Sequence, residues 1–209
     1  MELYKTVVKR ARTEQVINKS RFITTVSPVE SKEEADAFFD EIRSEFKDAT
    51  HNVPAFVIGD KMQLQWGSDD GEPQGTSGAP IVQMLTGEEL TNVALVVTRY
   101  FGGIKLGTGG LVRAYTGSAK QGIEAAGICT VNEMSATTYE TDYSSYNRIE
   151  NHKFDFEAEI DSVQYTDKVT FDLITDSLNK DIGKGILINL TGGSITEKCS
   201  KIVLRKIKK

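Results

Sequence analysis

The first part of the chain alternates apolar and polar side chains over residues 3–28, with a polar break at Asn18, Lys19 and Ser20. Alternation with a period of two is typical of strands, so this pattern predicts an antiparallel pair. A helix should follow, because Ser31 and Glu34 have the spacing of a capping box. The helix is expected to bury one apolar stripe, which comprises Ala35, Phe38, Phe39, Ile42 and Phe46.

Further strands are predicted at residues 53–58, 62–66 and 92–101, and the last should be buried on both faces because residues 93–97 are all apolar. Ser77 or Thr76 can cap a short helix that has Pro80 in its first turn. A longer helix is expected from Thr108 to Ala126, with Gly127 ending it. Its apolar face comprises Leu111, Tyr115, Ala119, Ile123 and Ala126.

The rest of the chain has a different order of elements. Strands are predicted at residues 133–141, 154–164, 168–175 and 194–207, and helices at 143–153 and 176–190. This β-α-β-β-α-β order is the ferredoxin-like pattern. We therefore predict an α+β (two-layer α/β) protein with one domain at residues 1–131 and a second at 132–209.

Composition limits the classes of function. The net charge of -5, from 25 Lys and Arg against 30 Asp and Glu, argues against a general polyanion-coating protein, so any nucleic-acid contact must be local. The N-terminus lacks the apolar core of a signal peptide, and no apolar run could span a bilayer. We expect a cytoplasmic protein with no membrane partner, in which the isolated Cys129 and Cys199 are buried structural thiols.

An acidic loop carries the first candidate chemistry. Asp69, Asp70 and Glu72 offer several carboxylate oxygens that could hold Mg²⁺. Carboxylates this close could also form an acid/base pair, with His51 as a partner if the fold brings it near. The alternative is a turn in which the Asp side chains accept hydrogen bonds from backbone N–H groups.

A glycine-rich turn after the buried strand is the candidate anion site. Its glycines can expose backbone N–H groups before a helix N-terminus, and Lys105 and Arg113 add positive charge. The alternative is tight packing at the glycines, with Arg99 paired to Asp69 or Asp70. The candidate set comprises Arg99, Gly102, Gly103, Lys105, Gly107, Gly109, Gly110 and Arg113.

Two charged segments lie in the second predicted domain. An acidic strand face, formed by Asp155, Glu157, Glu159 and Asp161, should repel phosphate and disfavours RNA bound across that sheet. A basic run follows near the C-terminus, with Lys198, Lys201, Arg205, Lys206, Lys208 and Lys209. This run could contact RNA or simply balance the acidic strand.

The segments SDDGEPQGTSGAP and TRYFGGIKLGTGGLVRAYTG resemble the signature of the IMPACT/YigZ family. The resemblance implies an N-terminal ribosomal-protein-type (ribosomal protein S5 domain 2-like) β-α-β domain and a C-terminal domain similar to the last domain of elongation factor G. Because both relatives touch RNA, it also implies a translation-associated binding protein that engages RNA or a ribosome-linked factor. Nothing in the sequence indicates specificity for DNA.

We expect such binding to use Arg99, Lys105 and Arg113, and Arg99→Ala or Arg113→Ala to weaken it without unfolding the protein. Two alternatives stay open. One is a Mg-dependent enzyme that acts on a phosphorylated or nucleotide-like small molecule. The other is a protein-partner module without nucleic-acid contact.

Overall fold

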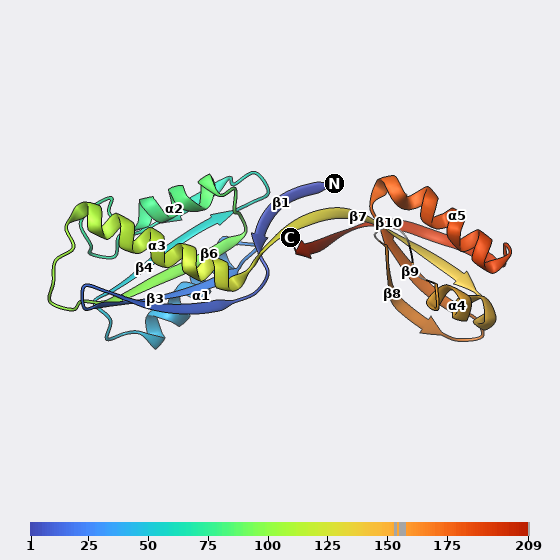
Figure 1. The fold of residues 1–209 in the computed structure, drawn as a ribbon, viewed down its shortest axis with the longest axis horizontal. Helices are drawn as coiled ribbons and strands as arrows, with labels where there is room; N and C mark the ends of the chain where they lie inside the picture. Colours follow the sequence, from blue (N-terminus) through green and yellow to red (C-terminus); the bar gives the residue numbers. More distant parts are fainter. Residues whose placement is uncertain (153, 155–157, 209) are drawn as a thin grey trace. The chain divides into compact units, whose positions relative to one another are not determined.

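A computed structural model describes residues 1–152, 154 and 158–208, which combine helices with two sheets (Figure 1). The chain divides into two compact units. The N-terminal unit comprises Leu3–Val131 together with the residues from Lys206 onward, and the C-terminal unit comprises Asn132–Arg205 together with Met1 and Glu2. The fold is therefore of the mixed α+β kind that the sequence predicts.

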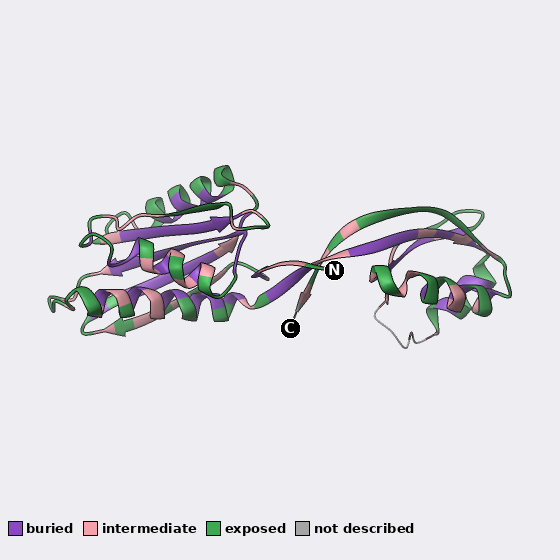
Figure 2. Cartoon of the chain, turned by 90° about the horizontal axis from the view of Figure 1, so that it is seen from above, coloured by how far each residue is buried: buried purple, intermediate pink, exposed green. Residues whose placement is uncertain are grey.

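The N-terminal unit is built on an antiparallel sheet with the strand order β2-β3-β6-β4-β5. Its strands are β2 (Ala11–Ile17), β3 (Ser20–Pro28), β6 (Val93–Tyr100), β4 (His51–Ile58) and β5 (Leu64–Gly67). Strand β6 lies in the middle, and its residues 93–97 are almost wholly buried, as its apolar sequence predicts. Figure 2 shows these buried strands between layers of helix.

Helices cover both faces of this sheet. Helix α1 (Lys32–Glu45) packs its predicted stripe with Phe56 and Val96 on one face. Helices α2 (Gly78–Gly87) and α3 (Thr108–Ala126) pack on the other face, where every residue of the predicted α3 stripe is buried. Gly127 follows as the C-cap of α3.

The N-terminal strands differ in detail from the prediction. The antiparallel pair is β2–β3, and its turn is made by Asn18 and Lys19, which have φ values of 46° and 66°. The preceding strand β1 (Glu2–Val7) pairs with β7 instead.

At the start of α1 the Ser31 side chain accepts from the Glu34 N–H, but the Glu34 carboxylate accepts from the N–H of Glu30, so the capping box is only half formed.

The C-terminal unit has the element order β-α-β-β-α-β. Its strands are β7 (Ile128–Thr141), β8 (Ala158–Tyr165), β9 (Val169–Thr175) and β10 (Ile195–Lys208), and its helices are α4 (Tyr143–Glu150) and α5 (Lys180–Thr191). Strands β1 and β10 both pair with β7, which is followed across the sheet by β9 and β8. Helix α5 begins later than predicted because a short 3-10 turn, η1 (Ser177–Asn179), precedes it, capped by the Asp176 side chain.

Charges in this unit pair with one another. Arg205 contacts Asp161 at 2.5 Å and Glu159 at 3.6 Å, while Lys198 contacts Glu140 at 3.1 Å. Lys201 lies 3.4 Å from Asp172. Lys198, Lys201 and Arg205 of the basic run are thus paired with acidic neighbours, whereas Lys206 forms no ion pair with the described residues. The predicted acidic residues Asp155 and Glu157, the Lys208 side chain and Lys209 lie outside the described residues.

Two other expectations can be compared with the described chain. No helix in it is long and apolar enough to cross a membrane. Cys129 is buried, as expected, whereas the expectation for Cys199 is wrong, because this residue is exposed on β10.

Candidate functional site

The three carboxylates of the acidic loop point to three different partners. Asp69 caps α2: one oxygen accepts from Ser77 N, Ser77 Oγ and Gly78 N at 3.0, 2.7 and 2.9 Å, and the other from Gly75 N at 2.7 Å. Burial alone would raise the pKa of Asp69, yet these hydrogen bonds outweigh it and hold the pKa below its ordinary value. Ser77 is the N-cap residue of α2, but its side chain makes no capping bond of its own.

Asp70 ties the acidic loop to the start of β4. Its side chain accepts from Asn52 N at 2.5 Å, and its carbonyl oxygen lies 2.7 Å from His51 Nδ1. Asp70 and Gly71 both have left-handed backbones, with φ values of 46° and 84°. This reversal of the chain turns the next residue, Glu72, toward the interior.

Glu72 is the buried partner of Arg99. Glu72 Oε1 lies 2.6 Å from Arg99 Nη1, and the two side chains are 4% and 6% exposed. The fully buried Tyr115 donates its hydroxyl to the same oxygen at 2.7 Å. Burial, and then this bond to Glu72, raise the pKa of Tyr115. The expected pairing of Arg99 with Asp69 or Asp70 is therefore corrected to Glu72.

The rest of the Arg99 side chain is enclosed by β3 and by the loop after β6. Its Cζ lies 5.4 Å from the ring centres of both Phe22 and Phe101, a cation–π distance. Nη2 donates to Ser20 Oγ at 3.3 Å, and Nε is buried without a hydrogen-bond partner. Arg99 is thus an internal cation at the end of the sheet rather than an exposed phosphate contact.

His51 is brought to this cluster by strand register, because it lies opposite Arg99 in the β4–β6 pair. Its Nε2 is 3.7 Å from Glu72 Oε1. The contact of His51 with Asp70 fixes the ring from the other side.

The proposed Mg²⁺ ligand set does not form a cluster. Asp69 is occupied by backbone donors, Asp70 by Asn52, and Glu72 by Arg99 and Tyr115. Within the described ranges, no group of three His, Cys, Asp or Glu side chains is placed to hold a metal ion. These residues therefore do not fit a magnesium site, and the alternative of Asp side chains satisfying backbone N–H groups describes Asp69 and Asp70.

A cavity of about 430 Å³ lies against the buried pair. It is lined by Thr50, His51, Glu72, Pro73, Arg99, Phe101, Lys105, Leu106, Gly107, Thr108 and Leu111. Gly107, with a φ of 70°, is the N-cap of α3, and no side chain in the described part of the chain caps this helix. The cavity therefore combines an open helix N-terminus with charged side chains.

The predicted anion-binding residues separate into two groups. Arg99, Lys105 and Gly107 line the cavity. Gly102, Gly103, Gly109, Gly110 and Arg113 do not. Gly102 has a packing role, because a Cβ there would lie 2.0 Å from the backbone of Lys19, and this contact holds the β2–β3 turn against the loop after β6.

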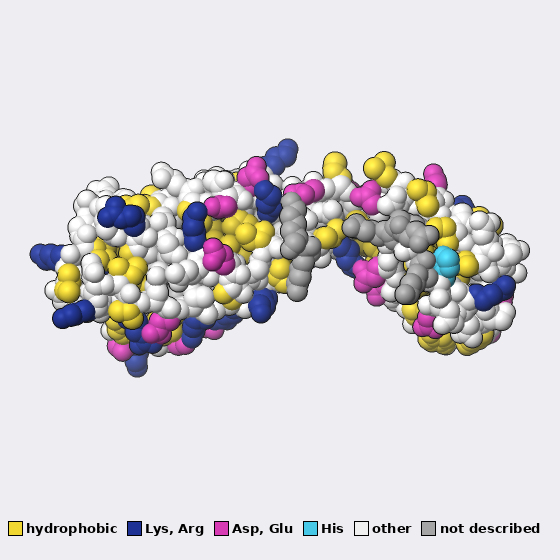
Figure 3. Space-filling model, in the orientation of Figure 1, with side chains coloured by type: hydrophobic (Ala, Val, Ile, Leu, Met, Phe, Trp, Pro, Cys, Tyr) yellow, Lys and Arg dark blue, Asp and Glu magenta, His cyan; other side chains and the backbone are white. Residues whose placement is uncertain are grey.

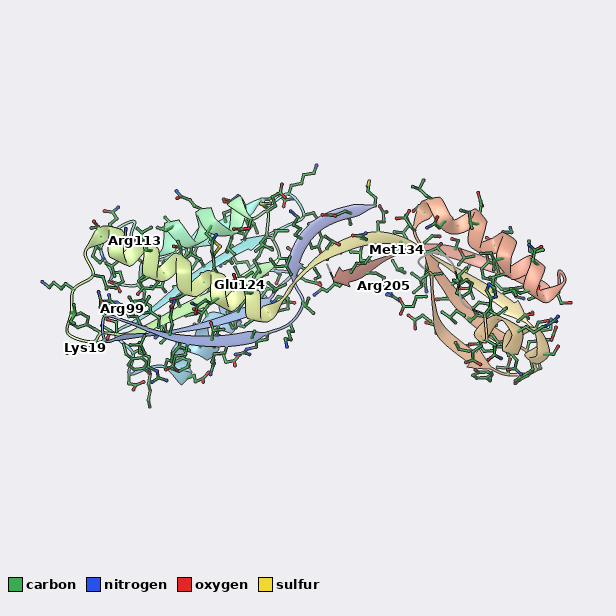
Figure 4. All side chains as sticks on the ribbon, viewed as in Figure 1. Lys19, Arg99, Arg113, Glu124, Met134 and Arg205 are labelled. Atoms are coloured by element: carbon green, nitrogen blue, oxygen red, sulfur yellow. The ribbon has the colours of Figure 1, made fainter. Side chains whose placement is uncertain are left out.

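Exposed cations surround this end of the N-terminal unit. Lys19, Lys105 and Arg113 are exposed, and none forms an ion pair with any residue that the structure describes. Figure 4 places Lys19 and Arg113 on either side of Arg99, and Figure 3 shows Lys and Arg side chains at the same end of the unit. We call Lys19, Lys105 and Arg113 the basic rim.

Comparisons with known proteins support a single family. Residues 18–123 match the family described as Impact N-terminal domain. The chain is 37% identical to "IMPACT family member YvyE" of Bacillus subtilis over 91% of this chain and 88% of that protein, and 41% identical to "IMPACT family member YigZ" of Escherichia coli over 64% and 67%. A solved structure described as a hypothetical protein aligns with a TM-score of 0.60 and 32% identity, covering 94% of this chain and 97% of that one. The chain belongs to the IMPACT family.

Proposed function

We propose that the chain is a translation-associated regulatory protein that binds RNA through the basic rim and the adjoining cavity. Membership of the IMPACT family suggests a translation-related regulatory role. The observation that carries the RNA proposal is the set of cations Lys19, Lys105 and Arg113, which have no ion-pair partner among the described residues, beside a helix N-terminus that no described side chain caps. Both features attract phosphate.

An exposed aromatic ring supports the same proposal. Phe101 is 47% exposed, lines the cavity and follows directly after β6. Single-stranded nucleic acids bind where bases stack on aromatic rings beside a positively charged groove. Phe101 and Lys105 together offer both elements within one loop.

The distribution of charge favours this end of the chain over the sheet of the C-terminal unit. Many of the cations there, among them Lys198, Lys201 and Arg205, are already paired with carboxylates. A phosphate would have to displace those carboxylates before it gained a contact. At the basic rim no such exchange is needed.

The proposal extends to the type of each domain. The family resemblance leads us to assign the N-terminal unit to the ribosomal-protein-type β-α-β domains and the C-terminal unit to the ferredoxin-like domains similar to the last domain of elongation factor G. The strand order β10-β7-β9-β8 with two helices supports the second assignment.

The test is co-sedimentation of the purified protein with ribosomes and with total cellular RNA at low and physiological salt. A Lys105→Ala/Arg113→Ala variant is compared with Lys9→Ala/Lys61→Ala, which removes the same charge from loops at the opposite end of the sheet. Binding that is lost only in the first variant supports the proposal. Ribosome binding that survives nuclease treatment and both variants would favour a protein-partner module instead.

A further inference from the structure

We propose that the cavity beside Arg99 receives a terminal phosphomonoester of an RNA strand, held by the N-terminus of α3 and by Lys105. This inference rests on the proposed function and names the group that the site recognises. The basic rim would contact the phosphodiesters that follow.

The size of the cavity favours the end of a strand. Its volume of about 430 Å³ is at the small end of the range for ligand pockets, which runs from about 300 to 1,000 Å³. Pro73, Leu106 and Leu111 give it apolar walls. A site of this size accommodates one nucleotide-sized group, whereas a continuous strand needs an open groove.

The donors for a phosphate are present and unused. Thr108 is the first residue of α3 and lines the cavity, and its N–H has no partner among the described residues. Lys105 on the same wall forms no ion pair within the described chain. Arg99 lines the cavity from the interior: its Nη1 and Nη2 already donate to Glu72 and Ser20, and its Nε, which has no hydrogen-bond partner in the described chain, is buried, so Arg99 adds no exposed donor.

The carboxylate in the wall does not oppose an anion. Glu72 Oε1 already accepts from Arg99 and Tyr115 at 2.6 and 2.7 Å, so its charge is compensated locally. Lys105 and the positive end of α3 then set the sign of the potential in the cavity.

A monoester gains more from this environment than a diester. A phosphomonoester carries about -1.5 to -2 charges at neutral pH, whereas a diester carries one. The attraction to fixed positive charges scales with the charge of the ligand. The cavity should therefore discriminate a phosphorylated RNA end from an unphosphorylated one.

Thr108→Pro is the specific variant. Proline is well tolerated at the first helical position, where it removes a single N–H. The preceding Gly107 has a φ of 70° and a ψ of 166°; this positive φ is open to glycine, and the extended ψ, with no Cβ present, avoids the clash with the proline Cδ. Thr108→Ala is the matched control, because it loses the same hydroxyl but keeps the N–H.

The experiment measures binding of one labelled single-stranded RNA by fluorescence anisotropy, with a phosphate at the 5′ end, at the 3′ end or at neither. We expect a phosphate at one end to strengthen wild-type binding by about tenfold, the effect of one hydrogen bond to a charged group. Thr108→Pro should abolish that gain and Thr108→Ala should keep it.

Each other outcome has a distinct meaning. Equal affinity for the three RNAs, still weakened by Lys105→Ala/Arg113→Ala, would overturn this inference and leave the proposed function standing. A nucleoside monophosphate that competes as well as the phosphorylated RNA would overturn the assignment to an RNA end in favour of a small phosphorylated molecule. Absence of binding to every RNA would overturn both the inference and the proposed function.

Discussion

Arg99→Ala is expected to destabilise the N-terminal unit, contrary to the expectation from sequence that it would weaken binding alone. The substitution leaves the Glu72 carboxylate, 4% exposed, with the Tyr115 hydroxyl as its remaining hydrogen-bond donor in the described chain. Removing one partner of a buried ion pair costs about 3–5 kcal/mol. Because Glu72 also lines a cavity that water can enter, we expect the lower end, about 3 kcal/mol.

The chain carries its own reporter for this measurement. Its single tryptophan, Trp66, lies in β5 with its ring centre 6.1 Å from that of Phe39 and 5.9 Å from that of Phe56. Tryptophan fluorescence in a urea titration therefore follows unfolding of the N-terminal unit. A loss of about 3 kcal/mol moves the midpoint by about 1.5 M when the m value is about 2 kcal/mol/M.

Two controls test whether the loss of stability comes from leaving a buried charge unpaired rather than from losing an arginine. Arg99→Met combined with Glu72→Leu and Tyr115→Phe removes both charges and the hydroxyl that Glu72 accepts from, and should recover most of the stability, because no unpaired ion or unsatisfied donor stays buried. Arg21→Ala removes an exposed arginine paired with Glu14 in the same sheet and should leave the midpoint unchanged. An Arg99→Ala midpoint equal to that of the wild type would refute the reasoning.

The other predictions concern the groups around this pair. Tyr115→Phe should lower the free energy of unfolding by about 1.5–3 kcal/mol in the same assay, because a buried hydrogen bond to a charged acceptor is lost; no change would mean that the hydroxyl is dispensable. Asp69→Asn should be less stable than the wild type at pH 7, because the α2 cap is weakened. Folding lowers the pKa of Asp69, so its carboxylate contributes to the free energy of unfolding above the unfolded pKa of about 3.9. This contribution is lost as the pH falls through the lower folded pKa. The difference in free energy of unfolding between Asp69→Asn and the wild type should therefore shrink as the pH falls from 7 to 2. A difference that stays constant over this range would contradict the role of the ionised Asp69 as the cap of α2.

Sequence patterns located the elements that carry the site. The α3 stripe and the doubly apolar β6 were predictable because helix and strand periods fix which side chains face the sheet. Whether His51 reaches the acidic loop could not be predicted, because its place beside Glu72 depends on the register that sets His51 opposite Arg99 in the β4–β6 pair.

The partners within the acidic loop were not predictable. Three carboxylates lie within four residues, and the backbone at Asp70 and Gly71 decides which one turns inward. Asp and Gly both adopt left-handed backbones more often than most residues, but their presence does not fix which neighbouring carboxylate turns inward. That Asp69, rather than Ser77, supplies the cap of α2 likewise depends on how the loop folds back onto the helix. Tyr115 gave a weak signal, as a polar hydroxyl within an otherwise apolar helix stripe, since a buried tyrosine hydroxyl usually has a partner.

The salt dependence of RNA binding tests the central claim most directly. Affinity of the wild type and of Lys105→Ala/Arg113→Ala for an unphosphorylated single-stranded RNA is measured across a range of salt concentrations. We predict that wild-type affinity falls steeply with salt and that the variant binds more weakly, with a slope of log K against log salt smaller by about 1.4, the value for two lost phosphate contacts on a single strand. Wild-type binding that is absent at low salt, or that is equal in slope and strength in the variant, would contradict the account.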